Sequence, residues 1–285
     1  MRGIIGAHIN SNLDYLIKEA ARIHNNGGNI VQLFVNIRSN KTKILYDDFK
    51  KFLKSKNMTC VVHISYTINC SQNWGYHSWW IKQFIMEIEY ANKIGALYVV
   101  IHLGKQLELS YEEALNNMYT SLLYVHKQTK NHIKILLETS TGQGSEVCFE
   151  LEKLAHFYKK ISKHNNSEIR DRFGICLDTC HIFASGYDIS TNDGVKKYFD
   201  LFNDLIGIEH IKLIHLNDSK KECGSKVDRH SNIGNGFIGQ NALISIKNMF
   251  IRLEVPIILE TPIEDQDKDL KLISNEGVCY MYNRK

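Results

Sequence analysis

The sequence predicts an α/β protein, a (β/α)8 TIM barrel, and three observations favour this fold. Eight short runs of apolar and β-branched residues recur along the chain, each about the length of a buried strand. Segments long enough for helices lie between the runs. Within each run the apolar residues are nearly continuous, as in parallel strands that are covered on both faces.

The expected strands, in chain order, are Gly3–Ile9, Ile30–Val35, Cys60–Ser65, Tyr98–Gly104, Ile133–Thr139, Phe173–Thr179, Ile211–Asp218 and Pro256–Pro262. Three intervening segments collect apolar side chains on one helical face. They are Asn12–Asn25, Trp79–Ile94 and Ala242–Leu253. We expect Ile17, Trp79 and Trp80 to lie on these buried faces. Further helices are expected at Tyr111–Lys130, Val147–Lys163 and Gly194–Leu205.

A doubly wound open sheet is the alternative α/β fold. That fold carries a glycine-rich phosphate turn after its first strand. Here the same position reads Ala-His-Ile-Asn at residues 7–10, which disfavours the open sheet. We therefore expect a single barrel domain over residues 1–285, because barrels of this length fold as one domain.

Composition narrows the class of protein further. With 44% hydrophobic and 23% charged residues the chain is typical of a globular protein, which excludes a disordered chain, a collagen and a coiled coil. No apolar run approaches the length of a membrane span. The seven cysteines, an odd number with irregular spacing, indicate free thiols in a reducing compartment. We expect a soluble intracellular protein of the cytoplasm, nucleus or virion, whose net charge of +4 permits a polyanionic partner without requiring one.

Six consecutive expected strands, the third to the eighth, end in a side chain that can bind a metal. These side chains are His63, His102, Glu138, Asp178, His215 and Glu260. His181 follows the sixth strand by three residues, and the long segment from Ser219 to Gly239 adds Asp228 and His230. Active sites of such barrels lie at the C-terminal ends of the strands, where we expect all nine side chains to converge.

A pocket of four carboxylates and five imidazoles requires cations, because like charges in a low-dielectric environment repel strongly. Histidine with Asp and Glu, and without cysteine, suits zinc or manganese in a hydrolytic site. Nine ligands are too many for one metal and fit a cluster of two or three, with one carboxylate bridging. Such clusters activate water and hold the oxygens of a displacement at phosphorus.

At four stretches the chain resembles the endonuclease IV family of apurinic/apyrimidinic (AP) endonucleases, and the resemblance covers essentially the whole chain. The stretches are Leu136–Gly144 (LLETSTGQG), Gly174–Tyr187 (GICLDTCHIFASGY), His215–Gly239 (with HLNDSKKECGSKVDRH and GNGFIG) and Ile258–Thr261 (ILET). Together they are far more specific than any single motif. The resemblance implies a hydrolase of base excision repair whose partner is duplex DNA containing abasic sites, with neither a membrane nor an obligate protein partner.

The resemblance also implies roles for the nine side chains. About three zinc ions per chain are expected, with manganese possible at some positions. The first ion takes His63, His102 and Glu138; the second takes Glu138, Asp178, His215 and Glu260; the third takes His181, Asp228 and His230. A hydroxide between the first two ions would attack the phosphate 5′ to the abasic sugar, leaving a 3′-hydroxyl and a 5′-deoxyribose phosphate. Glu138 and Glu260 are the expected catalytic residues.

DNA contacts are implied by the same likeness. The family bends the duplex and turns the abasic nucleotide out of the stack. Tyr66 matches a family tyrosine that enters the duplex, Arg38 lies near a family arginine, and we expect Arg229 to contact DNA as well. Thr67 stands where the family often has leucine, which weakens the apolar wedge beside Tyr66.

Other functions stay open as alternatives. A metal-dependent sugar isomerase or epimerase on the same barrel also uses Glu, Asp and His at strand ends, but with one or two metals. It would not need His63, His102 or the pair Asp228 and His230. An amidohydrolase barrel requires His-x-His at the first strand, where only His8 stands. A non-enzymatic DNA-binding module is disfavoured, because the sequence shows no helix-turn-helix, zinc finger or strongly basic face.

Overall fold

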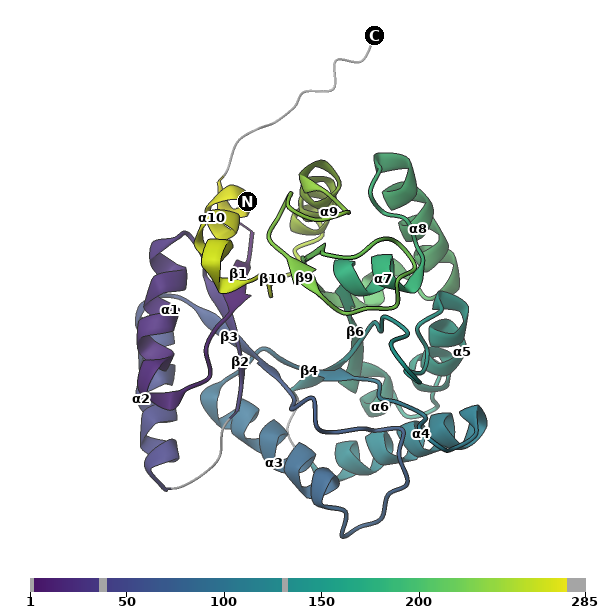
Figure 1. The fold of residues 1–285 in the computed structure, drawn as a ribbon. Coiled ribbons are helices and arrows are strands. Elements are labelled where there is room, and N and C mark those ends of the chain that lie inside the picture. The colour runs from purple at the N-terminus through teal and green to yellow at the C-terminus, as the bar shows by residue number, and fades with distance from the viewer. Residues whose placement is uncertain (1–2, 36–39, 130–132, 276–285) are drawn as a thin grey trace.

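The computed structural model describes residues 3–35, 40–129 and 133–275, and these contain a closed barrel of eight parallel strands (Figure 1). The strands are β1 (Ile5–His8), β2 (Ile30–Phe34), β3 (Thr59–His63), β4 (Tyr98–His102), β5 (Lys134–Glu138), β6 (Phe173–Asp178), β7 (Ile211–His215) and β10 (Ile257–Leu259). They pair in chain order around the barrel, and β10 closes it against β1. The predicted barrel and all eight expected strands are thereby confirmed.

Helices surround the barrel (Figure 1). They are α1 (Leu16–Asn25), α2 (Asn40–Ser55), α3 (Trp79–Ile94), α4 (Tyr111–Gln128), α5 (Leu151–Ser162), α6 (Ser167–Arg172), α7 (Thr179–Ser185), α8 (Asn192–Leu205), α9 (Gln240–Arg252) and α10 (Ile263–Ser274). Single 3-10 turns stand at Leu13–Tyr15 and Ile208–His210. Between β7 and α9 lies a long segment, residues 216–239, which we call the excursion. Within it β8 (Asp218–Ser219) and β9 (His230–Ser231) pair antiparallel.

Buried apolar side chains form two clusters, one on each face of the closed sheet. The inner cluster fills the barrel with one residue from each of seven strands: Ile30, Val61, Val100, Leu136, Cys176, Leu213 and Ile258. The larger outer cluster packs strand residues such as Val62 and Val99 against helix residues such as Phe84 and Ile88. Because side chains alternate between the two faces of a strand, a strand buried on both faces is apolar throughout.

Some predictions about the helices were wrong. Trp80 is buried as predicted, but Trp79 is 59% exposed. Adjacent residues on a helix point about 100° apart, so two neighbours do not both face the core. Ile17 is 41% exposed, and Ile23 takes its place in the core. The sequence analysis did not separate α2, α6, α7 and α10 from loops.

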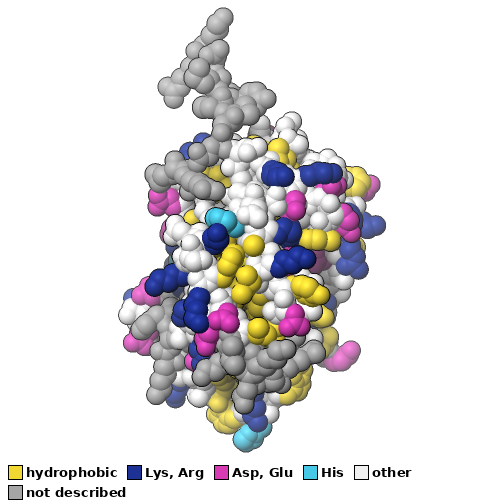
Figure 2. All heavy atoms as spheres, turned by 90° about the vertical axis from the view of Figure 1, so that its left-hand side faces the viewer, with side chains coloured by type: hydrophobic (Ala, Val, Ile, Leu, Met, Phe, Trp, Pro, Cys, Tyr) yellow, Lys and Arg dark blue, Asp and Glu magenta, His cyan; other side chains and the backbone are white. Residues whose placement is uncertain are grey.

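The surface on the α1–α2 side carries both signs of charge. Lys and Arg side chains are interspersed there with Asp, Glu and hydrophobic side chains (Figure 2). A mixed surface gives no concentrated positive potential for a polyanion. Within the part of the chain that the structure describes, no helix is long and apolar enough to cross a membrane.

Candidate metal centre

Polar side chains line the inside of the barrel at the C-terminal ends of its strands. Each residue of the inner apolar cluster is followed two positions later by a polar residue, and side chains two apart share a strand face. These polar residues therefore point into the barrel between the apolar layer and the C-terminal opening of the barrel, which we call its mouth. They are Gln32, His63, His102, Glu138, Asp178, His215 and Glu260. His8, at the end of β1, lies beside them, with Nδ1 3.6 Å from Oε1 of Glu260.

The first group of donors joins β3, β4 and β5. Nε2 of His63 and Nε2 of His102 lie 3.1 and 3.2 Å from the same oxygen, Oε2 of Glu138. Nδ1 of His63 lies 2.8 Å from the carbonyl oxygen of Ile64, which only accepts, so Nδ1 carries a proton. The lone pair of the neutral ring is then at Nε2. All three side chains offer donor atoms within 4.8 Å of one another, close enough to converge on one ion.

The second group uses the other oxygen of Glu138. Oε1 of Glu138 lies 2.9 Å from Nδ1 of His215. The same nitrogen is 3.2 Å from Oε2 of Glu260 and 3.9 Å from Oδ2 of Asp178. Donor atoms of these four residues also lie within 4.8 Å of one another. Glu138 therefore belongs to both groups.

The third group takes two side chains from the excursion after β7. Oδ2 of Asp228 lies 3.4 Å from Nε2 of His181, and its Oδ1 lies 3.2 Å from Nε2 of His230. Asp178 is 3.6 Å from the same His230 nitrogen. Asp178 also caps α7, where it accepts a hydrogen bond from the backbone N–H of His181 at 2.9 Å. Asp178 thereby connects the second and third groups.

Two imidazole nitrogens in the third group fit a metal ion. Nε2 of His181 and Nε2 of His230 are buried, and neither has a partner of hydrogen-bonding geometry among the described residues. The other ring nitrogens face carbonyl oxygens, those of Thr139 at 2.7 Å and Glu260 at 3.2 Å. Carbonyls only accept, so in the neutral form of each ring the lone pair is at Nε2, from which it could be donated to a metal ion. The remaining donors are carboxylates and imidazoles, which suit zinc.

Cys180 was not expected in this group. Its sulfur lies within 4.8 Å of donor atoms from Asp228 and His230. The thiol is directed at the carbonyl oxygen of Arg229 at 3.8 Å, and burial raises its pKa to about 12. The protonated thiol is therefore favoured, and we leave Cys180 out of the ligand set.

Charges within the cluster shift the pKa values of its members. Burial by itself lowers the pKa of His230, but neighbouring carboxylates, foremost Asp178, outweigh burial and raise it to about 9. Burial by itself raises the pKa of Glu138, but the imidazoles of His102 and His215 hold it well below its usual range. The pKa values of His181, His215 and His230 are raised, so protons on these imidazoles balance the carboxylates when no metal is bound, and divalent ions would displace them.

Two fully buried amides beside the cluster were missed by the sequence analysis. Asn217 donates to Oδ2 of Asp178 at 2.6 Å and accepts from the backbone N–H of Glu260 at 2.8 Å. Gln32 contacts Glu260 and two histidines. The sequence held a signal for Gln32, because it is the one polar residue within the apolar run Ile30–Phe34.

Asp218 holds the excursion that carries part of the third group. Its two carboxylate oxygens accept hydrogen bonds from four backbone N–H groups between Gly234 and Gly239. Gly236 passes so close that an added Cβ would lie 2.4 Å from Oδ1 of Asp218. On the other side, Ser219 pairs with His230 between β8 and β9. One carboxylate therefore organises the loop beside the predicted metal ligands.

The predicted DNA contacts differ in what the structure shows of them. Tyr66 follows β3 and is 77% exposed. The loop is anchored beside it, because Glu87 of α3 accepts from the backbone N–H of Ser65 at 2.9 Å. Arg229 is exposed on the excursion, between two members of the third group. Arg38 lies outside the described residues.

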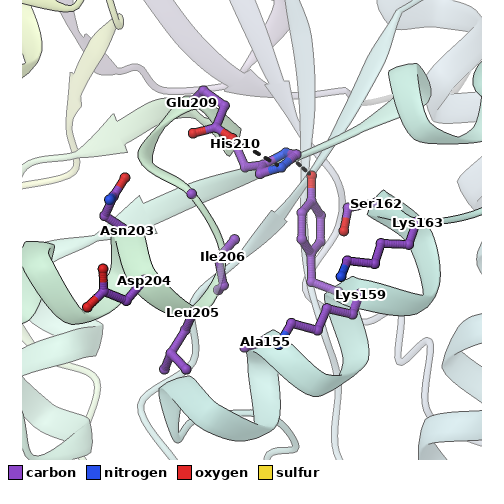
Figure 3. A pocket seen from close by; sticks show the side chains of 12 residues that line it. Ala155, Lys159, Ser162, Lys163, Asn203, Asp204, Leu205, Ile206, Glu209 and His210 are labelled. Atoms are coloured by element: carbon purple, nitrogen blue, oxygen red, sulfur yellow. Dashed lines mark hydrogen bonds and ion pairs between the residues drawn. The ribbon is translucent and has the colours of Figure 1, made fainter.

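A separate cavity of about 490 Å³ lies between the C-terminal ends of α5 and α8, next to the start of β7 (Figure 3). This is the opposite end of the barrel from the predicted metal ligands. Its two sides carry opposite charges, with lysines on one and carboxylates on the other: Lys159, Lys163, Asp204 and Glu209. None of the nine predicted ligands lines it, so it is not part of the candidate centre.

Comparison with known proteins agrees with this geometry. The family described as a xylose isomerase-like TIM barrel matches residues 20–278. A putative endonuclease 4 of Acanthamoeba polyphaga mimivirus is 36% identical, over 91% of this chain and 86% of that protein. A probable endonuclease 4 of Mycoplasmopsis agalactiae is 35% identical, over 94% and 97%. The crystal structure of endonuclease IV from Thermus thermophilus has the same fold, with a TM-score of 0.74 at 23% identity over 94% of this chain and 97% of that one.

The family description alone does not separate nucleases from isomerases, because it names only the barrel. The sequence relatives do separate them, since both are called endonuclease 4 and are matched along most of their length. The chain therefore belongs to the endonuclease IV family within the xylose isomerase-like TIM barrels.

Proposed function

We propose that this protein is a metal-dependent DNA-repair endonuclease that hydrolyses the phosphodiester 5′ to an abasic site in duplex DNA. The products would be a 3′-hydroxyl and a 5′-deoxyribose phosphate. The observation that carries the proposal is the convergence of nine donor side chains in three groups, which share Glu138 and Asp178. A hydrolytic site with several metals suits attack on a phosphodiester.

The three groups would hold about three zinc ions, with manganese as an alternative at some positions. The first group is His63, His102 and Glu138; the second is Glu138, Asp178, His215 and Glu260; the third is His181, Asp228 and His230. When bound, the ions would supply Lewis acidity, which lowers the pKa of water and neutralises charge on the phosphoryl oxygens.

Glu260 is the carboxylate that we expect to accept a proton from the attacking water. Its side chain is 15% exposed, whereas those of Glu138 and Asp178 are at most 1% exposed. Burial by itself raises the pKa of Glu260, but His215 holds it well below its usual range, so the carboxylate is ionised. Gln32 donates to Oε1 of Glu260, while Oε2 faces Nδ1 of His215 at 3.2 Å. Glu138, with both oxygens engaged, keeps the first two groups together.

Tyr66 and Arg229 would bind the substrate. An abasic nucleotide has no base to unstack or unpair, so turning it out of the duplex costs least at the lesion. An exposed aromatic ring on an anchored loop can fill the space that the nucleotide leaves. A guanidinium beside the third group can bind the neighbouring phosphate.

The test is incision of a duplex that contains one synthetic tetrahydrofuran site. We expect a cut immediately 5′ to the lesion, little cutting of the matched undamaged duplex, and loss of activity after chelation that zinc restores. Isomerisation of a free ketose or aldose without any incision would refute the proposal and favour the sugar isomerase or epimerase. Binding of the lesion duplex by zinc-loaded protein without incision would refute it in favour of a binding module.

A further inference from the structure

Gln32 is a fully buried glutamine among ionisable side chains. A buried amide needs hydrogen-bond partners, and the hydrogen bonds that its side chain makes all go to residues at the mouth of the barrel. Nε2 of Gln32 lies 2.7 Å from Oε1 of Glu260 and 3.1 Å from Nδ1 of His8. Oε1 of Gln32 lies 2.9 Å from Nε2 of His215. Gln32 thus touches two members of the second group at once.

The contact with Glu260 determines which way the amide points. An ionised carboxylate only accepts hydrogen bonds, so the amide must turn its NH2 group toward Glu260. The reversed amide would bring two oxygens together at 2.7 Å. Oε1 of Gln32 must then face His215. Because an amide oxygen only accepts, Nε2 of His215 must carry a proton.

That proton decides what His215 offers to a metal. A neutral imidazole carries one N–H, so a proton at Nε2 leaves the lone pair at Nδ1. Nδ1 is the nitrogen that lies 2.9 Å from Glu138 and 3.2 Å from Glu260, inside the second group. The same amide therefore selects the donor atom of one ligand and orients the carboxylate of another.

A neutral amide suits this position better than the other polar side chains. Glutamate could accept from His215 but would place a negative charge against Glu260, and lysine or a protonated histidine would add a cation where metal ions are needed. Methionine would fill the volume without a hydrogen bond. Metal-binding histidines usually donate their second N–H to such a partner, which fixes the tautomer and the ring orientation.

We propose that Gln32 is a positioning residue for the second metal group, holding His215 in the tautomer that presents Nδ1 and orienting Glu260. The inference rests on the proposed function only in taking this group as a metal site. Its experimental test therefore measures metal binding directly and does not depend on DNA cleavage.

The experiment compares wild type, Gln32→Met and Gln266→Met after loading with zinc. Gln266, on α10, is a matched control because it is 3% exposed and its amide is also hydrogen-bonded, but to Arg22 and to the backbone carbonyls of Thr261 and His8 and not to a side chain of the second group. A chromogenic chelator competes for zinc, and atomic emission gives the zinc that remains. We expect Gln32→Met to bind one zinc per chain about ten- to a hundredfold more weakly. Gln266→Met should bind zinc as wild type does. Cobalt(II) in place of zinc should show an altered visible spectrum in Gln32→Met alone.

Equal zinc affinity and equal cobalt spectra in all three proteins would overturn the proposal. Circular dichroism checks folding, and Gln32→Glu takes the place of Gln32→Met if the latter does not fold. Glutamate still accepts from His215 but cannot donate to Glu260, so we expect weakened binding of one zinc, and unchanged binding would again overturn the proposal. A wild-type protein that binds zinc without cutting abasic DNA would refute the proposed function, while the zinc comparison would still decide the role of Gln32.

Discussion

Nδ1 of His215 lies 2.9 Å from Oε1 of Glu138, although β6 separates the strands that carry these two residues. The other oxygen of Glu138 faces the histidines of β3 and β4. The carboxylate of Glu138 therefore contacts donors from β3 and β4 with one oxygen and a donor from β7 with the other. This arrangement leads to a first prediction about the bridging charge.

Replacing Glu138 with Gln should nearly abolish incision, lowering kcat by about a hundredfold or more, and should reduce bound metal. The amide is neutral and can accept at only one of its two ends, so it cannot serve both groups. Incision of a tetrahydrofuran duplex and zinc content by atomic emission measure the two effects. Wild-type activity in this variant would contradict the assignment of Glu138.

The metal-free protein should lose stability as the pH rises from about 6.5 to 9. The pKa of His230 is raised to about 9, so its proton stabilises the folded state below the ordinary histidine pKa. That contribution is lost as the pH rises through the raised value. Over the same range zinc affinity should increase, because zinc no longer competes with the proton.

Thermal unfolding of chelator-treated, dialysed protein at pH 6 and pH 9 checks this prediction. The variant His230→Asn is the control, since it lacks the titrating group and should show a weaker pH dependence. A metal-free protein that is as stable at pH 9 as at pH 6 would show that His230 is not charged in the folded state.

Tyr66→Ala should reduce discrimination between abasic and intact duplex by roughly tenfold, which is the scale of one aromatic stacking contact. The Tyr66 ring is exposed and packs edge-on against Phe34, which is not one of the predicted metal ligands, at a centroid distance of 6.1 Å. Zinc content should therefore stay at the wild-type level. Tyr66→Phe keeps the ring and should keep the discrimination. Depleted zinc in Tyr66→Ala would instead mean that the loop supports the metal centre.

Arg229→Ala should raise KM about five- to tenfold with little change in kcat, because a phosphate contact binds substrate and transition state alike. The salt dependence of DNA binding should also fall, by about one counterion. Arg252, exposed at the end of α9, is a matched control whose replacement by Ala should change neither quantity. Equal KM values for the two variants would contradict the prediction that Arg229 contacts DNA.

The strands and their terminal ligands could be predicted because two simple constraints act on them. A barrel strand covered on both faces must be apolar, and a metal ligand at its end interrupts that pattern with a His, Asp or Glu. His63, Asp178 and Glu260 all stood out in this way, and the structure brings them to one mouth of the barrel. Their roles as ligands stay predictions, which the variants above address.

The parts that could not be predicted depend on packing between distant segments. Asn217 looks like an ordinary loop residue until Asp178 and Glu260 are brought against it. Trp79 and Trp80 are equally apolar, and only the direction from which the barrel approaches α3 decides which one is buried. Asp218 likewise gains its role only when the loop at Gly236 folds onto it.

The excursion after β7 divides the candidate metal centre into a part built on the barrel and a part built on a loop. Seven of the nine side chains come from the barrel strands, from the residue directly after β10 or from α7, whereas Asp228 and His230 lie on a segment that Asp218 ties down. A protease that cut this segment would break the chain connection on one side of Asp228 and His230 and leave the closed sheet intact. Zinc held by Asp228, His230 and His181 would protect the chain from digestion at that point, so increased resistance to cleavage there would report on the filling of the third group.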